Sequence, residues 1–339
     1  MTDKKDKDGT KFNLSRRSMF GAIAAGAAAS LPLAAQSQPA QTPPKPAPSG
    51  GGGSKRQGGA GPLQVLFMSK HHSYDRENLF LALDSLGDDI TWTQVDHPAA
   101  EAFYDPRLME PYDVVLSYDA YAGRKFTRGP DGKVTGVDTP PSAQTQANLK
   151  ALLQAGNKGF VFFHHALSSW AQTWPAGLNG SNAYSEVMGG AADWGKPLQN
   201  IRGRYYQASG ALGNTKQHIT VVDKNHPVTQ GIEDFDIVDE AYLCPIFEDS
   251  VHPLLRTDFK PVDTAFVGRE RTQGHPPGSN LTGWVKVAER SPVVYIQHGH
   301  SASAWEHPSW RKLMLNAIRW AASPEAKAWA KANEKRIFL

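Results

Sequence analysis

An α/β fold with one largely parallel sheet is the architecture that the sequence predicts. Short apolar runs of strand length, such as 65–68, 160–163 and 293–296, alternate with segments whose apolar residues recur at helical spacing. Strands of a parallel sheet are covered on both faces and are therefore apolar throughout, whereas the helices between them are apolar on one side. The chain shows no internal repeat, which indicates a single domain.

The first part of this domain contains two strands around an amphipathic helix. Residues 65–68 form a buried strand, and the leucines that follow at four- and three-residue spacing predict a helix that Gly87 can end. Residues 90–95 alternate between apolar and polar, as a half-buried strand does, and 114–116 form the next buried strand.

The rest of the domain repeats this pattern. A helix opens at Pro140–Ser142 and closes at Gly156, just before the strand 160–163. The strand 293–296 is followed by a helix from Pro308, and a charged helix starts at Pro324. The intervening region, 170–290, is rich in Gly, Pro, Trp and His, and we expect long inserted loops with some added strands there.

The N-terminus has the pattern of a twin-arginine signal peptide over residues 1–36. Arg16 and Arg17 precede an apolar, alanine-rich run over 21–35, which ends in small residues that suit a signal peptidase. The run is too short and too weakly apolar for a transmembrane helix. We therefore expect a periplasmic or secreted protein with no stable membrane insertion after cleavage of the signal.

Three further segments follow the signal. Residues 37–62 are rich in Pro, Gly, Ser and Gln and are expected to form a flexible linker. The folded domain is expected over 63–322, and a C-terminal helical tail over 323–339.

Composition excludes several classes of function. The net charge is +3, but beyond residue 36 acidic and basic residues are equal in number, so no electrostatic footprint for nucleic acid is present. The one cysteine, Cys244, cannot form an intramolecular disulfide. No phosphate-cradling glycine motif follows the first strand, which argues against a nucleotide cofactor. The sequence does not indicate the oligomeric state.

Pairs of histidines follow three of the predicted strands. They are His71 and His72 after the first strand, His164 and His165 after the central strand, and His298 and His300 after the late strand. Ligands of open α/β sheets bind beyond the carboxyl ends of the strands, so these side chains are expected to meet at one rim. Neutral imidazole binds metals, and its pKa lies near 7. The histidines therefore suit either a divalent metal such as zinc or acid/base chemistry without one; the candidate ligands are His72, His164, His165, His298 and His300.

A pair of carboxylates adds to this constellation. Asp239 and Glu240 end an alternating run, and Tyr242 follows. Adjacent residues of a strand point to opposite faces, so one carboxylate is expected to enter the site while the other holds a loop or a histidine of the site.

Other candidates have a structural interpretation too. Isolated histidines are more often hydrogen-bonded structural residues, and this applies to His97, His218, His252, His275 and His307. The dipeptide His226–Pro227 predicts a turn. Tryptophans can belong to the core, but exposed ones in loops near the histidines suit stacking on sugar rings; the candidates are Trp170, Trp174, Trp194 and Trp305.

Four motifs in order resemble the ThuA-like, or trehalose-utilisation, family over residues 63–322. They are FVFFHHA at 160–166; Tyr184 and Glu186 with Met188–Gly190; His226–Pro227 with Gly231, Phe235 and the DE-x-Y run at 239–242; and Gly299–His300 with Trp305, Pro308 and Trp320. The resemblance implies a flavodoxin-like fold, similar to that of class I glutamine amidotransferases. It also implies a link to sugar catabolism, in particular to 3-keto glycosides made by partner dehydrogenases.

This sequence departs from the family at several positions. Amidotransferases use a cysteine at the turn after the central strand, and His164 and His165 occupy that turn here, so amidotransferase chemistry is not implied. The family usually carries a histidine shortly after Gly190, where this chain has Asp193 and Trp194. His165 and His298 are additions.

These features predict a periplasmic enzyme that cleaves or isomerises a carbohydrate, in particular a keto-glycoside. His164, Glu240 and His300 are the candidate catalytic residues, with His72 beside them. The candidate substrate-binding residues are Trp170, Tyr184, Asp239, Tyr242 and Trp305. The alternative is a non-catalytic periplasmic sugar-binding module.

Overall fold

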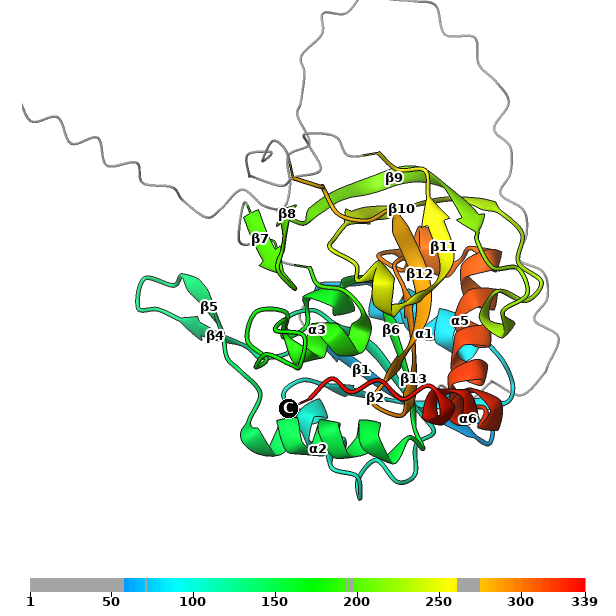
Figure 1. The fold of residues 1–339 in the computed structure, drawn as a ribbon, viewed down its shortest axis with the longest axis horizontal. Coiled ribbons are helices and arrows are strands. Elements are labelled where there is room, and N and C mark those ends of the chain that lie inside the picture. Colours follow the sequence, from blue (N-terminus) through cyan, green and yellow to red (C-terminus); the bar gives the residue numbers. More distant parts are fainter. Residues whose placement is uncertain (1–57, 71, 193, 195–197, 261–274, 339) are drawn as a thin grey trace, which may run out of the picture. The chain divides into compact units, whose positions relative to one another are not determined.

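The sheet at the centre of the domain contains nine strands in the order β10-β9-β11-β12-β13-β6-β3-β1-β2 (Figure 1). It is seen in a computed structural model that describes residues 58–70, 72–192, 194, 198–260 and 275–338. The expected signal at 1–36 and most of the expected linker lie outside these described residues.

Five adjacent strands form the parallel half of the sheet. They are β13 (Ser291–Ile296), β6 (Gly159–Phe163), β3 (Val114–Asp119), β1 (Leu63–Lys70) and β2 (Ile90–Asp96). Each contains one of the runs that the sequence predicts as a strand, so the predicted α/β class is confirmed.

Four strands extend this sheet in antiparallel pairing. They are β12 (Leu281–Ala288), β11 (His252–Thr257), β9 (Gly210–Val221) and β10 (Phe235–Leu243). They come from the region expected to hold loops with added strands, and the added strands are longer than that expectation implies. Two hairpins stand outside the sheet: β4 (Arg124–Arg128) with β5 (Val134–Asp138), and β7 (Leu198–Ile201) with β8 (Arg204–Gln207).

Helices cover both faces of the sheet. Along β1, Val65 and Phe67 face one apolar cluster, with α5 (Pro308–Ala322), while Leu66 and Met68 face the other, with α2 (Ala143–Ala155). This alternation is the period of a strand that is buried on both sides. The remaining helices are α1 (Arg76–Asp84), α3 (Ala183–Met188), α4 (Ala302–Trp305) and α6 (Pro324–Ala332), with 3-10 turns η1 (Ala99–Tyr104), η2 (His164–Ser168), η3 (Pro227–Thr229) and η4 (Glu248–Ser250).

The predicted helix signals act as expected at α2. The side chain of Ser142 accepts a hydrogen bond from the backbone N–H of Thr145 at 3.0 Å, as an N-cap does. Gly156 ends the helix with a φ of 64°, in the left-handed region that glycine adopts without strain.

The expected linker ends earlier than the sequence indicates. Gly58 already accepts a backbone hydrogen bond from Trp92, and Gly59 forms a bridge with Thr91 of β2. A side chain at Gly59 would meet the carbonyl oxygen of Ile90 at 2.2 Å. Glycine here permits close packing against the sheet, although in the sequence it resembles linker composition.

The C-terminal tail is helical only in part. After α6, Lys335 forms a bridge with Glu289, and Ile337 and Phe338 are buried. The Glu289 carboxylate accepts hydrogen bonds from the backbone N–H groups of both these residues, at 2.7 and 3.0 Å. The tail therefore completes the core instead of standing apart from it. None of the helices in the described residues is long and apolar enough to span a membrane.

Candidate functional site

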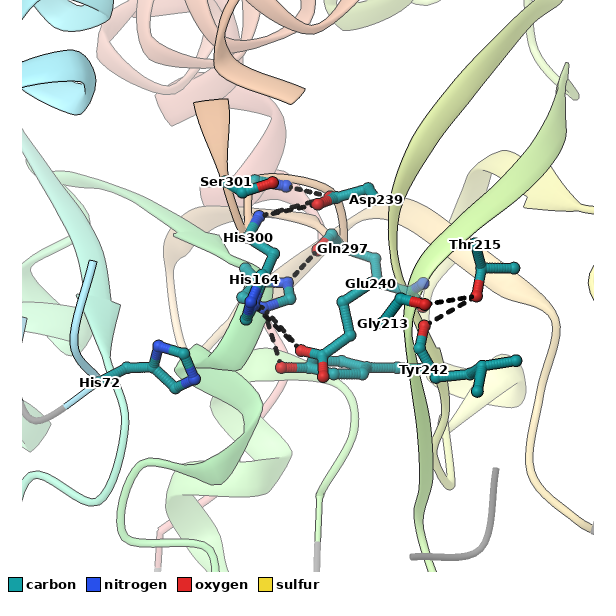
Figure 2. A network of polar contacts seen from close by, with 12 residues as sticks. His72, His164, Gly213, Thr215, Asp239, Glu240, Tyr242, Gln297, His300 and Ser301 are labelled. Carbon is teal, nitrogen blue, oxygen red and sulfur yellow. Dashed lines mark hydrogen bonds and ion pairs between the residues drawn. The ribbon is translucent and has the colours of Figure 1, made fainter. Parts of the chain in front are cut away.

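The predicted rim holds a cluster of polar side chains from separate strands (Figure 2). His164 follows β6 directly, His300 follows β13, and Glu240 lies on β10. His72, which follows β1, points toward the same cluster. The convergence of these strand ends is the arrangement expected for the ligand site of an open α/β sheet.

His164 lies at the centre and is held from two sides. Its φ of 51° lies in the left-handed region, which is uncommon for residues with a side chain and marks a backbone fixed by its surroundings. The hydroxyl of Tyr295 donates to its carbonyl oxygen at 2.6 Å. The ring Nδ1 lies 2.9 Å from the backbone oxygen of Gln297 and must donate, because a carbonyl only accepts. This bond fixes the ring and directs Nε2 into the cluster.

Three electron-rich atoms surround that Nε2 atom. It lies 2.9 Å from Nδ1 of His300, 2.9 Å from the hydroxyl oxygen of Tyr242 and 3.2 Å from Oε2 of Glu240. Oε2 of Glu240 is in turn 3.1 Å from Nδ1 of His300. Within the described residues, the donor atoms of His164, Glu240 and His300 form a possible metal-binding group, all within 4.8 Å of one another. We call these three residues the histidine–carboxylate centre.

Asp239 and Glu240 divide their roles as the sequence predicts. The Asp239 carboxylate accepts hydrogen bonds from the backbone N–H of Gly299 at 2.7 Å and of His300 at 3.2 Å. Glu240 instead contacts the two histidine rings. One neighbour therefore positions the loop and the other enters the centre.

A β-bulge lies beside Glu240. Asp239 pairs with Thr215 of β9, but Ala241 pairs with Leu212, so the partner strand has an extra residue at this point. The Thr215 hydroxyl donates to the backbone oxygen of Leu212 at 2.9 Å. Bulges of this type are frequent beside sites, and this one lies on β9 opposite Glu240 of β10.

The charges of the centre favour an ionised carboxylate. Burial acts to raise the pKa of Glu240, but its contacts with His164 and His300 outweigh burial and hold the pKa well below its usual range. Burial lowers the pKa of His300, but contact with Glu240 outweighs this effect and raises the pKa above its ordinary value. Burial, with the nearby His300 and His164, lowers the pKa of His72.

Three predicted metal ligands lie outside this donor group. The His72 ring is 5.0 Å from the His300 ring and stacks on His165 at 4.9 Å, between centroids. His165 and His298 are buried, and no ring nitrogen of either has a hydrogen-bond partner within the described residues. Burial lowers the pKa of His298 to about 4. The rim thus gathers His72, His164, His165 and His300, whereas His298 makes none of the ring contacts that join them. The neighbour His71 lies outside the described residues.

The expectation of exposed tryptophans is wrong for three of the four. Trp170, Trp174 and Trp305 are buried, with exposed fractions of 2, 5 and 1%, so they have no free face for a sugar ring. Trp305 donates to the backbone oxygen of Gly299 at 2.8 Å and thereby supports the loop that carries His300. Trp194 is partly exposed, and its ring lies 5.2 Å from that of Tyr242.

The other predicted substrate-binding residues differ in position. The Tyr242 hydroxyl is part of the cluster. Tyr184 is buried in the core, with its hydroxyl 3.4 Å from that of Tyr104. The predicted contact of Tyr184 with substrate does not fit this buried position. The carboxylate of Asp239 is used by the backbone of the His300 loop. Asp193 lies outside the described residues.

The residues that fix His164 were not singled out from the sequence. Gln297 acts through its backbone oxygen, so its side chain carries no signal of this role. Tyr295 lies within an apolar strand and resembles an ordinary core residue. Its hydroxyl is the one signal in the sequence, because a buried tyrosine hydroxyl needs a hydrogen-bond partner.

Comparison with known proteins identifies the family. A family model described as "Trehalose utilisation", ThuA, matches residues 64–321. A ThuA-like protein from Parabacteroides merdae has a similar fold, with 15% identity, a TM-score of 0.54, and coverage of 77% of this chain and 90% of that one. A ThuA-like protein from Bacteroides uniformis is also 15% identical, with a TM-score of 0.48 and coverage of 78% and 93%.

A glutamine amidotransferase from Thermotoga maritima is 10% identical, with a TM-score of 0.35 and coverage of 78% and 100%. A search of curated proteins finds no match. The fold, the order of the motifs and the family model agree, and the chain belongs to the ThuA, or trehalose-utilisation, family.

Proposed function

We propose that this protein is an exported carbohydrate-active enzyme that cleaves or isomerises a glycoside, in particular a keto-glycoside, at the histidine–carboxylate centre. The observation that carries the proposal is the meeting, at one rim of the sheet, of His164 and His300, which follow β6 and β13, with Glu240 of β10. Membership of the trehalose-utilisation family supports a sugar as the substrate.

The centre suits a divalent ion of the zinc type. Ligand atoms at about 2.0 Å from a tetrahedral ion are about 3.3 Å apart. The contacts among His164, Glu240 and His300 are 2.9 to 3.2 Å, close to that spacing. The hydrogen bond that fixes the ring of His164 is the usual support of a metal-binding histidine. Such an ion, when bound, polarises a carbonyl group or activates water.

The side chains around the centre suit a substrate that carries a carbonyl group. The Tyr242 hydroxyl faces the centre and can donate a hydrogen bond to an oxygen on which negative charge develops. His72 lies beside His300 but outside the donor group, where its imidazole can accept a proton from the carbon next to a carbonyl. In an ion-free centre, Glu240 would take the part of general base and His300 that of general acid.

The side-chain exposures of the centre are graded. They are 0% for His164, 19% for Glu240 and 30% for His300, so solvent reaches the centre at His300 and Glu240. A sugar can therefore reach His300 and Glu240, while His164 is shielded from water.

Export is part of the proposal. The twin-arginine pattern at residues 1–36 supports it, because this route carries folded proteins and is often used when a metal is loaded in the cytoplasm. Protein recovered from its own export route is thus the correct material for metal analysis.

The first test is the metal content of that protein. We expect about one equivalent of a divalent transition metal, lost in His164→Ala and His300→Ala and kept in His218→Ala. His218 is an exposed histidine paired with Asp236, which makes it a matched control. Less than about a tenth of an equivalent in the wild-type protein would exclude a resident metal.

The second test is turnover of 3-keto-glycosides, compared with the parent glycosides, with the products analysed. His164→Ala and His300→Ala should each lose at least about a hundredfold in rate, the low end for acid/base catalysis. Binding without product at any metal loading would overturn the proposed enzymatic activity and favour a non-catalytic sugar-binding module.

A further inference from the structure

A cleft lies outside the histidine–carboxylate centre. It has a volume of about 580 Å³, and its walls come from β8, from the segment after β10 and from residues 276–279. Sites for small molecules usually measure about 300 to 1,000 Å³, whereas one water in a liquid occupies about 30 Å³. The cleft is therefore large enough for a disaccharide-sized ligand. None of the residues of the centre lines it.

One wall of the cleft is rigidly built around Arg202. Its Nε lies 3.3 Å from Oε1 of Glu186, whose side chain is only 2% exposed, and its Nη1 lies 2.6 Å from Oδ1 of Asp249. The guanidinium also lies over the Phe247 ring, at 5.0 Å from the centroid. A buried carboxylate beside a planar guanidinium fixes the direction of its remaining N–H groups.

Glu248, another lining residue, is also held in place by hydrogen bonds. Glu248 accepts a hydrogen bond from the Ser279 hydroxyl at 2.5 Å and another from Nη2 of Arg256 at 2.6 Å. Glu248 and Ser279 both line the cleft. Polar groups held in this manner lose little side-chain entropy when a ligand binds.

Strand β8 adds two further side chains to the cleft. Arg204 and Tyr206 are two residues apart, so they point to the same face of the strand, and both line the cleft. Tyr205, between them, points to the other face, is 50% exposed and has its ring 6.0 Å from that of His275. The two faces of one short strand thus provide test residues and a control.

The charges of the cleft are balanced. Arg202 and Arg204 are matched by Glu248 and Asp249, so the lining has no net charge with which to select an ion. Guanidinium groups only donate hydrogen bonds and carboxylates only accept them, while a hydroxyl does both. Together with the tyrosine ring this composition suits many neighbouring hydroxyl groups. We infer that the cleft is a second binding site, for a neutral polyhydroxylated ligand of the di- or oligosaccharide class.

The test is calorimetric titration of the full chain with trehalose, with maltotriose and with the anionic sugar glucuronate. We expect a neutral sugar to bind with a Kd below about 10 mM. Arg204→Ala and Tyr206→Ala should each weaken this binding at least tenfold, while Tyr205→Ala changes it less than twofold. Thermal unfolding of each variant checks that the fold is kept.

A separate variant distinguishes the cleft from the centre. His300→Ala should leave the calorimetric affinity unchanged, even if it abolishes turnover. The inference is overturned if neither neutral sugar binds below about 10 mM, if glucuronate binds more tightly than both, or if His300→Ala removes binding that Arg204→Ala and Tyr206→Ala leave intact. In the last case the histidine–carboxylate centre is the sugar site, and the proposed function survives without the second site.

Discussion

Glu240 lies 3.1 Å from the Nδ1 atom of His300, and the residue before it, Asp239, accepts the backbone N–H of the same histidine. Two consecutive carboxylates thus hold one histidine, by its ring and by its main chain. The contact with Asp239 fixes the position of the His300 backbone, and the contact with Glu240 fixes the orientation of its ring. This relationship suggests how the centre responds to substitution.

Replacement of Asp239 should lower the stability of the domain. Asp239→Ala leaves the buried N–H of Gly299 without its acceptor and should lower the free energy of unfolding by about 1 to 3 kcal/mol. Asp239→Asn keeps one acceptor oxygen and should cost less. Urea denaturation of both variants measures the difference. Equal losses for Ala and Asn would show that these hydrogen bonds do not hold the loop.

Replacement of Glu240 should act on metal affinity. Glu240→Gln keeps the shape of the side chain but removes the charge that faces both histidines. We expect affinity for zinc to fall at least tenfold, the lower end of the effect for residues that merely support ligands. Competition with a chromophoric chelator measures it. Glu233→Gln is the control, since Glu233 is exposed and pairs with Lys224; an equal fall in both would refute a ligand role for Glu240.

Tyr295 should stabilise the domain through the hydrogen bond that its hydroxyl donates to His164. Tyr295→Phe removes the hydroxyl that donates to the buried carbonyl of His164, and we expect a loss of about 1 to 3 kcal/mol in the free energy of unfolding. Tyr205→Phe, which alters a half-exposed side chain, should change it by less than about 0.5 kcal/mol. Chemical denaturation of the two variants checks the prediction. A loss no larger than that of the control would mean that other contacts fix His164.

His226 should make the domain less stable in mild acid. Its Nδ1 accepts the backbone N–H of Val228 at 3.1 Å, so the ring caps η3 in its neutral form, and burial lowers its pKa to about 4. The unfolded chain has the ordinary pKa near 6.5, so it binds a proton first as the pH falls. The contribution of the neutral ring is complete above pH 6.5 and is lost progressively toward pH 4.

The ring is only partly buried, so after screening by solvent we expect this loss to be about 1 kcal/mol. His226→Asn keeps a side-chain acceptor for the cap and removes the titration. Thermal unfolding at pH 7 and at pH 4.5 should show a smaller difference for the variant than for the wild type. An unchanged difference would assign the acid sensitivity to other groups.

The parallel half of the sheet could be predicted because its strands are buried on both faces. The run at β6, for example, is short, apolar throughout and rich in aromatic residues, which favours a buried strand. The antiparallel half was harder to see. Strand β12 includes Gly283 and the buried Lys286, which interrupt an apolar pattern. Lys286 is accommodated because it donates to the backbone oxygen of Glu186, a contact that arises only from the tertiary fold.

In the candidate site, too, some residues could be predicted from the sequence and others depend on the tertiary fold. Strand ends that converge could be inferred from the general geometry of α/β sheets, so His72, His164 and His300 were found. His298 was misplaced because Gly299, with a φ of 132°, turns the chain there and breaks the alternation of a strand. The loop tryptophans were misjudged for a related reason: ring contacts such as that of Trp170 with Tyr184, at 5.2 Å, depend on loops whose path the sequence does not fix.

The pairing of β6 with β13 has a consequence for how the protein is made. His164 and His300 follow these neighbouring strands, which lie about 130 residues apart, and the loop that joins the strands must close before the two histidines meet. Partly folded chains therefore lack the complete donor group. An ion that binds only the finished group would stabilise the whole domain by about 2.7 kcal/mol at a free concentration of 100 times its Kd. In the export route that we propose, metal supply during synthesis would then act as a check that the sheet is complete before the protein leaves the cytoplasm.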